Sequence, residues 1–112
     1  MKHVIFLSNA QYSDVLLTDD IVVCIANGSY TKVLMNNNKS ILVSKNLSWV
    51  ENLISLDSFI RLHKSYYVNL KYVNKVFNGE DKIRLFTEIE IPISRYKKKI
   101  FWEKITTYYQ NC

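Results

Sequence analysis

A chain of 112 residues, 48% of them hydrophobic, is long enough to form one globular domain that buries roughly two thirds of its unfolded surface. Its net charge is +5, and its two cysteines, Cys24 and Cys112, fit neither a zinc site nor a disulfide framework. No apolar run is long enough to cross a membrane, and the N-terminal run is too short for a signal peptide. We therefore expect one cytoplasmic domain over residues 1–112, with no membrane partner and with Cys24 as a buried thiol.

The basic charge is concentrated in the second half of the chain. Residues 1–57 carry four Lys and Arg against five Asp and Glu, whereas residues 58–112 carry eleven against five. The two halves therefore have net charges of −1 and +6. This asymmetry indicates a surface that faces a polyanion, either nucleic acid or anionic lipid, although lysines that are simply solvated remain an alternative.

Short strands account for most of the chain, because β-branched and aromatic runs alternate with turn residues. Turns are expected at Asn27-Gly28, at residues 36–38 and at Asn78-Gly79. The pattern predicts ten strands, over residues 3–7, 15–17, 21–26, 29–35, 40–44, 59–62, 66–69, 72–77, 82–86 and 88–94.

Two helices interrupt the strands. A short surface helix is expected over residues 46–56, capped by Asn46 or Ser48, because its apolar residues recur at spacings of three and four: Leu47, Val50, Leu53 and Ile54. A second helix is expected to begin at Ser94 as its N-cap. Its core-facing stripe should comprise Ile100, Phe101, Ile105, Tyr108 and Tyr109, opposite the lysines Lys97, Lys98 and Lys104. Trp49 and Trp102 lie in these helices, which we expect to pack on the sheets.

The stretch FIRLHKSYYVN at residues 59–69 contains a charge in an otherwise apolar row. Even-numbered positions from Ile60 to Leu70 are apolar except Lys64, and burying an unpaired ammonium is costly. We interpret residues 63–65 as a break in the strand that points Lys64 into solvent or toward a ligand.

The residues argue against an enzyme, a cofactor or a metal site. Gly28 and Gly79 are too far apart for a phosphate-binding glycine loop, and His63 has no neighbouring ligand at metal spacing, so it is expected to be a hydrogen-bonded structural residue. Glu88 and Glu90 could suggest acid–base chemistry, but we interpret them as the solvated face of an edge strand.

Basic residues at element boundaries remain to be explained. Arg95 follows the expected N-cap Ser94 directly, with Lys97 and Lys98 close behind. A helix N-terminus favours phosphate binding, whereas an Arg at this position could instead offer its guanidinium to a guanine edge.

These residues resemble the LytTR family of bacterial DNA-binding domains. FIRLHKSYYVN is similar to the pattern F-x-R-x-H-[RN]-S-[YF]-[LIV]-V-N, and EIEIPISR is similar to a later strand that ends [IV]-[PSA]-[VI]-S-R. The upstream NGSYTKVLM is similar to the strand and loop that precede the helix in that family. The resemblance extends from about Val4 to Ile105.

The resemblance implies a mainly β fold, an elongated assembly of small antiparallel sheets with one short surface helix and a C-terminal helix. It also implies loops that enter two successive major grooves and the intervening minor groove. The contact regions then fall near Tyr30 and Lys32, at Lys64 and Ser65, and at Arg95, Lys97 and Lys98. Lys64 stands where family members more often have Arg, so we expect it to contact phosphate rather than bases. Tyr30 either contacts DNA or packs on the sheet.

The function expected from this reasoning is that of a sequence-specific transcriptional regulator that binds double-stranded DNA through inter-strand loops. It would act as a monomer in solution or a dimer on paired DNA repeats. Many related proteins carry a receiver domain ahead of this part, and we expect a complete domain without that phosphorylation input. The alternative is a non-enzymatic interaction module whose basic half binds an acidic protein or RNA.

Overall fold

The computed structural model describes residues 3–8 and 11–110. Two α-helices occur in this part of the chain, α1 (Leu47–Ile54) and α2 (Lys98–Gln110). Its strands are β1 (Val4–Ser8), β2 (Ser13–Leu17), β3 (Ile21–Asn27), β4 (Tyr30–Met35), β5 (Ser40–Val43), β6 (Phe59–His63), β7 (Tyr66–Asn69), β8 (Val73–Val76), β9 (Lys82–Leu85) and β10 (Glu90–Pro92). All ten predicted strands are present, with ends that shift by a few residues.

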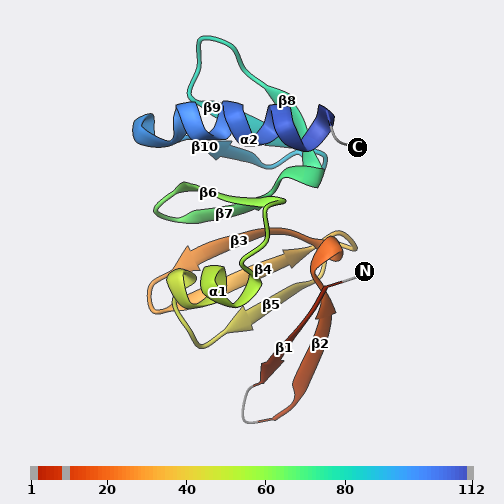
Figure 1. Cartoon of the computed structure of the whole chain (residues 1–112). Helices are drawn as coiled ribbons and strands as arrows, with labels where there is room; N and C mark the ends of the chain where they lie inside the picture. Colours follow the sequence, from red (N-terminus) through yellow and green to blue (C-terminus); the bar gives the residue numbers. More distant parts are fainter. Residues whose placement is uncertain (1–2, 9–10, 111–112) are drawn as a thin grey trace.

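The strands form three antiparallel sheets that follow one another along the molecule (Figure 1). Strands β1 and β2 form a ribbon, the middle sheet has the order β5-β4-β3-β7-β6, and the third has the order β10-β9-β8. The principal extents are 45 × 32 × 24 Å, so the molecule is longer than it is wide. The expected elongated, mainly β assembly of small sheets with a short helix and a C-terminal helix is confirmed.

The middle sheet is covered on both faces, which is why β3 reads as a continuous apolar run. One hydrophobic cluster contains Cys24 and Val33 and joins this sheet to α1 and to the β1–β2 ribbon. A second cluster contains Val23 and Val68 and joins the opposite face to the third sheet and α2. Alternation along the strands therefore builds two cores from one sheet.

Helix α1 is closed at its start by Asn46, whose Oδ1 accepts a hydrogen bond from the backbone N–H of Trp49 at 2.9 Å. Leu47, Val50 and Ile54 are buried, as their spacing predicts. Leu53, the remaining member of this apolar repeat, is 37% exposed. The predicted cap and helix are confirmed.

Helix α2 begins later than the sequence suggests. Ser94 is extended and makes no side-chain cap; a 3-10 turn, Arg95–Lys97, follows it, and the α-helix starts only at Lys98. The predicted N-cap at Ser94 is wrong for the α-helix, because the three residues of the 3-10 turn lie between Ser94 and Lys98; the Ser94 N–H donates to the Leu62 carbonyl at 2.7 Å.

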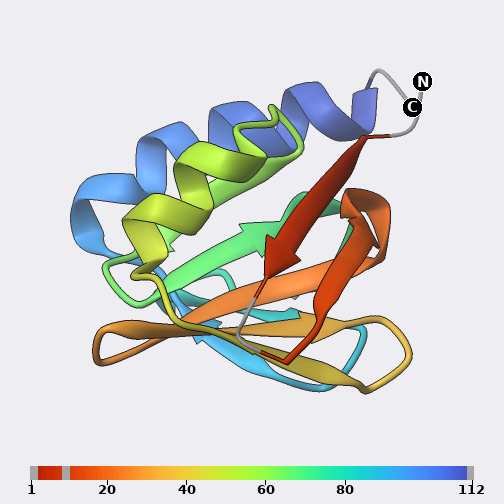
Figure 2. The same ribbon diagram turned by 90° about the horizontal axis from the view of Figure 1, so that it is seen from below.

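The buried stripe of α2 is narrower than predicted. Phe101 and Ile105, one turn apart, are buried, and Tyr108 packs partly against them. Ile100 and Tyr109 are 44% and 46% exposed, so their assignment to the core is wrong, although the Tyr109 hydroxyl donates to the Leu70 carbonyl at 2.8 Å. This helix lies on the outside of the molecule (Figure 2), and its buried residues are Phe101 and Ile105.

Both tryptophans are partly exposed, although both helices pack on the sheets. Trp49 is 41% and Trp102 46% exposed, so neither ring fills a core. Trp102 makes an edge contact with Phe101, and the Lys45 ammonium lies 5.5 Å from the centre of the Trp49 ring.

The predicted break at residues 63–65 is confirmed. Strand β6 ends at His63 and β7 begins at Tyr66, so Lys64 and Ser65 form a two-residue connection. The register shifts between Arg61 and His63, and Lys64 is exposed. The charge in the apolar row thus lies outside the ladder.

The contrast between neighbouring aromatics on α2 gives a stability test. Phe101→Ala should destabilise the fold by about 3 to 5 kcal/mol, because its ring is fully buried. Trp102→Ala should cost clearly less, because nearly half of its surface stays exposed. Urea denaturation midpoints of the two variants measure the difference; equal losses would contradict the packing described for this helix.

Alkaline pH should destabilise the protein through two buried acids. Burial raises the pKa of the Cys24 thiol from 9.0 to about 12, and burial together with the Glu51 charge raises that of Tyr67 from 10.0 to about 12. The unfolded chain releases these protons first, so stability is complete below about pH 9 and falls as the pH rises toward 12. Urea midpoints of wild type and Cys24→Ala from pH 8 to 11 should show a shallower fall in the variant; parallel profiles would contradict this account.

Candidate nucleic-acid interface

Three connections that are far apart in the sequence lie at the same end of the molecule (Figures 1 and 2). They are the β3–β4 connection at residues 28–29, the β6–β7 connection at residues 64–65, and the 3-10 turn Arg95–Lys97. We call this region the loop end. It brings together the sequence regions in which all seven candidate contact residues were predicted.

Backbone hydrogen bonds fix the three connections relative to one another. The Ala26 N–H donates to the Ser65 carbonyl at 2.8 Å, joining the first connection to the second. The Ser94 N–H donates to the Leu62 carbonyl at 2.7 Å, joining the third to strand β6. The loop end therefore has a geometry set by main-chain bonding rather than by side chains alone.

The first connection depends on Gly28, whose φ of +62° is rarely adopted by other residues. Beyond it, Tyr30 and Lys32 point to the same face of β4 because they are two residues apart. Tyr30 is 46% exposed and Lys32 is exposed, whereas Thr31 between them is buried and donates to the Lys45 carbonyl at 2.8 Å. Both candidate side chains are accessible from solvent.

The second connection presents Lys64. Its side chain is exposed, while Ser65 is half-buried. The Ser65 N–H donates to His63 Nδ1 at 3.1 Å, so His63 is a hydrogen-bonded structural residue as expected. The ring holds the turn from inside and leaves the lysine on the outside.

The third connection presents Arg95, which is exposed and whose guanidinium carbon lies 5.5 Å from the centre of the Tyr96 ring. Tyr96 is 85% exposed. The sequence analysis did not select Tyr96, although an aromatic residue inside the basic run RYKKK is a recognisable signal for nucleic-acid contact. Arg95 and Tyr96 thus offer a cation and an aromatic face together.

The cations of the loop end differ from those in the rest of the basic half in whether they have a carboxylate partner. Arg84 and Lys82 both bind Glu90, at 2.8 and 3.0 Å. Lys98 is paired with Asp81 at 2.7 Å, a partner that the sequence did not suggest. Within the described residues, Lys64, Arg95 and Lys97 have no carboxylate within ion-pair distance. The cations of the loop end are therefore largely uncompensated.

Comparison with known proteins agrees with this arrangement. The sequence model of the family described as the LytTr DNA-binding domain matches residues 13–106. This chain belongs to the LytTR family. The match contains every candidate contact residue, and the predicted resemblance to the LytTR family is confirmed. The family is one of DNA-binding domains, so DNA is the partner of this domain.

A solved structure shares the fold of this LytTR domain. It is described as the LytTr DNA-binding domain of a methyl-accepting/DNA response regulator from Bacillus cereus, with 19% sequence identity and a TM-score of 0.75. The match covers 91% of this chain and 95% of the other. No curated protein matches the sequence.

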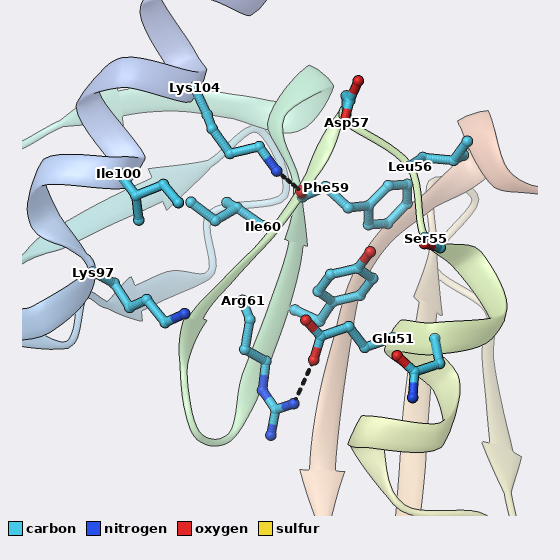
Figure 3. A pocket seen from close by; sticks show the side chains of 12 residues that line it. Glu51, Ser55, Leu56, Asp57, Phe59, Ile60, Arg61, Lys97, Ile100 and Lys104 are labelled. Atoms are coloured by element: carbon cyan, nitrogen blue, oxygen red, sulfur yellow. Dashed lines mark hydrogen bonds and ion pairs between the residues drawn. The ribbon is translucent and has the colours of Figure 1, made fainter.

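A cavity of about 300 Å³ opens beside the loop end of the LytTR domain, between α1, β6 and the start of α2 (Figure 3). Lys97 and Lys104 both line this cavity, and the Lys104 ammonium donates to the Phe59 carbonyl at 2.9 Å. Within it, the Arg61 guanidinium and the Glu51 carboxylate face each other at 2.8 Å. Neither Arg61 nor Glu51 was a predicted site residue, because their pairing depends on how α1 lies against β6.

Two further observations concern chemistry other than DNA binding. In residues 3–8 and 11–110, no group of three His, Cys, Asp or Glu could hold a metal ion, and no helix there is long and apolar enough to cross a membrane.

Glu88 has a φ of +73° in a turn, so its assignment to a strand face with Glu90 is wrong. Hydrogen bonds from Arg84 and Lys82 lower the pKa of Glu90, which keeps it ionised.

Proposed function

We propose that this LytTR domain is a sequence-specific transcriptional regulator that reads double-stranded DNA through the loop end. The observation that carries the proposal is that Lys64 and Arg95, from two separate connections, lie exposed at one end of a LytTR-family chain, with no carboxylate partner among the described residues. The domain spans residues 1–112 and works in the cytoplasm, where bacterial DNA lies.

The two helices do not favour reading by a recognition helix. Helix α1 is only eight residues long and buries one face, and the residues of α2 that lie near the loop end are at its first turn. Loops that project beyond the sheet are better placed to enter a groove, while neighbouring lysines meet the backbone phosphates. This arrangement supports base reading through loops.

Each candidate residue has a role in the proposal. Arg95 reads a guanine edge, because a guanidinium can form two parallel hydrogen bonds to the guanine O6 and N7 atoms. Lys64 and Lys97 contact phosphates as point charges. The other contacts are supplied by Tyr30, Lys32, Ser65 and Lys98, the last after exchanging Asp81 for a phosphate.

Selection from a random duplex library, with the purified domain at near-physiological salt, tests the proposal. An enriched motif supports sequence-specific binding, and its occurrence once or as a repeat distinguishes a monomer from a dimer on paired sites. Binding to random duplex, single-stranded RNA and an acidic peptide should be at least a hundredfold weaker than to the selected duplex. Equal affinity for these competitors would instead favour an interaction module for acidic proteins or RNA.

The affinity for the selected duplex should fall steeply with salt. Each phosphate neutralised by a cation of the loop end contributes a slope of about −0.9 to log K against log salt. Fluorescence anisotropy measured between about 50 and 300 mM salt gives this slope. A flat response would argue against DNA binding through the loop end.

Replacing Arg95 and Lys97 should separate specificity from affinity. Arg95→Ala should cost about 1 to 3 kcal/mol on the selected site and relax selectivity at one base pair. Lys97→Ala should weaken all duplexes alike and reduce the salt slope by about one. Competition assays against single-base variants of the site measure both effects.

Arg95→Lys is the control for this pair of variants. Lysine keeps the charge and loses the planar fork, so a residue that reads a base stays impaired. If Arg95→Lys restored both affinity and base preference, Arg95 would be a phosphate contact rather than a reader.

A further inference from the structure

The side chain of Arg61 is engaged on three sides by the protein itself. Its Nη1 binds Glu51 Oε1 at 2.8 Å, its Nε donates to the His63 carbonyl at 3.1 Å, and its Nη2 donates to the Lys64 carbonyl. The side chain is only 19% exposed. Arg61 therefore joins α1 to the backbone of the β6–β7 connection and has little surface left for a ligand.

These contacts determine which way the connection points. Two successive carbonyls, those of His63 and Lys64, are turned toward the guanidinium on the inside. The Ser65 N–H is held by His63 Nδ1, and the Ser65 carbonyl accepts from Ala26. With these main-chain groups bound inward, the Lys64 side chain is the part of the connection left facing solvent.

Glu51 anchors the guanidinium to a rigid element. It lies in the middle of α1, whose start is fixed by the Asn46 cap and whose buried face packs on the middle sheet. Figure 3 shows the two side chains pointing toward each other across the cavity. The carboxylate thus sets the position of Arg61, and Arg61 sets the position of the connection.

We propose that Arg61 and Glu51 are positioning residues for DNA binding, which hold the connection carrying Lys64 and Ser65 in its binding geometry without touching DNA. This inference rests on the proposed function and deepens it. A planar guanidinium can serve two carbonyls and a carboxylate at once, whereas an ammonium on a flexible stem cannot reproduce that fork. Preorganising the connection lowers the ordering cost when DNA binds.

A double-mutant cycle tests the proposal on the selected duplex. Arg61→Lys and Glu51→Gln should each weaken binding by about tenfold in the wild-type background. In the Lys64→Ala background the same changes should weaken binding by less than about twofold, because the contact they position is already gone. Equal losses in the two backgrounds would overturn the proposal.

The ion pair of Arg84 with Glu90 supplies matched controls. It has a similar distance, 2.8 Å, and lies between β9 and β10, away from the β6–β7 connection. Arg84→Lys and Glu90→Gln should change the affinity by less than twofold, roughly the size expected for an exposed pair. A tenfold loss in these controls would show that any ion pair affects binding and would overturn a specific role for Arg61.

Amide hydrogen exchange without DNA separates this inference from the proposed function. The Ser65 amide donates to His63 Nδ1, and the Ala26 amide of β3 donates to the Ser65 carbonyl. In Arg61→Lys and Glu51→Gln both amides should exchange at least tenfold faster, whereas the amides of α2 should be unchanged. If the wild type selects no duplex, the proposed function fails while this result still decides whether the pair holds the connection. Unchanged exchange at Ser65 and Ala26 overturns the proposal. Should Arg61→Lys fail to fold, Glu51→Gln, which leaves Arg61 in place, gives the same two readouts.

Discussion

Strand β6 is the edge of the middle sheet, and the hydrogen bonds on its open side join this sheet to the C-terminal segment. An edge strand exposes unpaired carbonyls, which must find other partners when they are covered. Here Lys104 of α2 binds the Phe59 carbonyl, and the Ser94 N–H binds the Leu62 carbonyl. These bonds fix the C-terminal segment against the edge strand, and they place Arg95, the residue after Ser94, at the loop end.

The same strand connects the two cores. Phe59 belongs to the cluster under α1 and stacks on Tyr67, while Ile60 and Leu62 belong to the cluster under the third sheet.

Asn69, buried at the end of β7, donates to the Ile21 carbonyl at 2.9 Å and accepts from the Lys71 N–H at 3.0 Å. The Asn of the YYVN motif is therefore a structural residue that joins β7 to β3. A buried amide without such partners would be strongly destabilising.

Electrostatics divides the basic half into two kinds of surface. On β9 the two cations Lys82 and Arg84 share one carboxylate, that of Glu90 on β10, and such exposed pairs contribute little to stability. At the loop end, Arg61 is satisfied inside the protein, and the cations outside it are left without carboxylate partners in the described part of the chain. The loop end therefore presents Lys64 and Arg95 to solvent, while the Arg61 guanidinium is bound by the protein itself.

The sequence by itself determined the strand content, the cap of α1 at Asn46 and the break at Lys64. These depend on local properties: β-branched alternation, a side chain that accepts from the N–H three residues on, and the cost of burying an ammonium. The motifs also located the segments that form the loop end.

Tertiary structure alone decided which side chains are buried, exposed or bound to other elements. A 3-10 turn separates Ser94 from α2, the Ser94 N–H donates to a carbonyl of β6, and Trp102 is partly exposed because α2 buries only a narrow face. Arg61 and Glu51, ten residues apart, meet because α1 folds back against β6. Such pairings depend on how elements pack, which residue-level propensities do not encode.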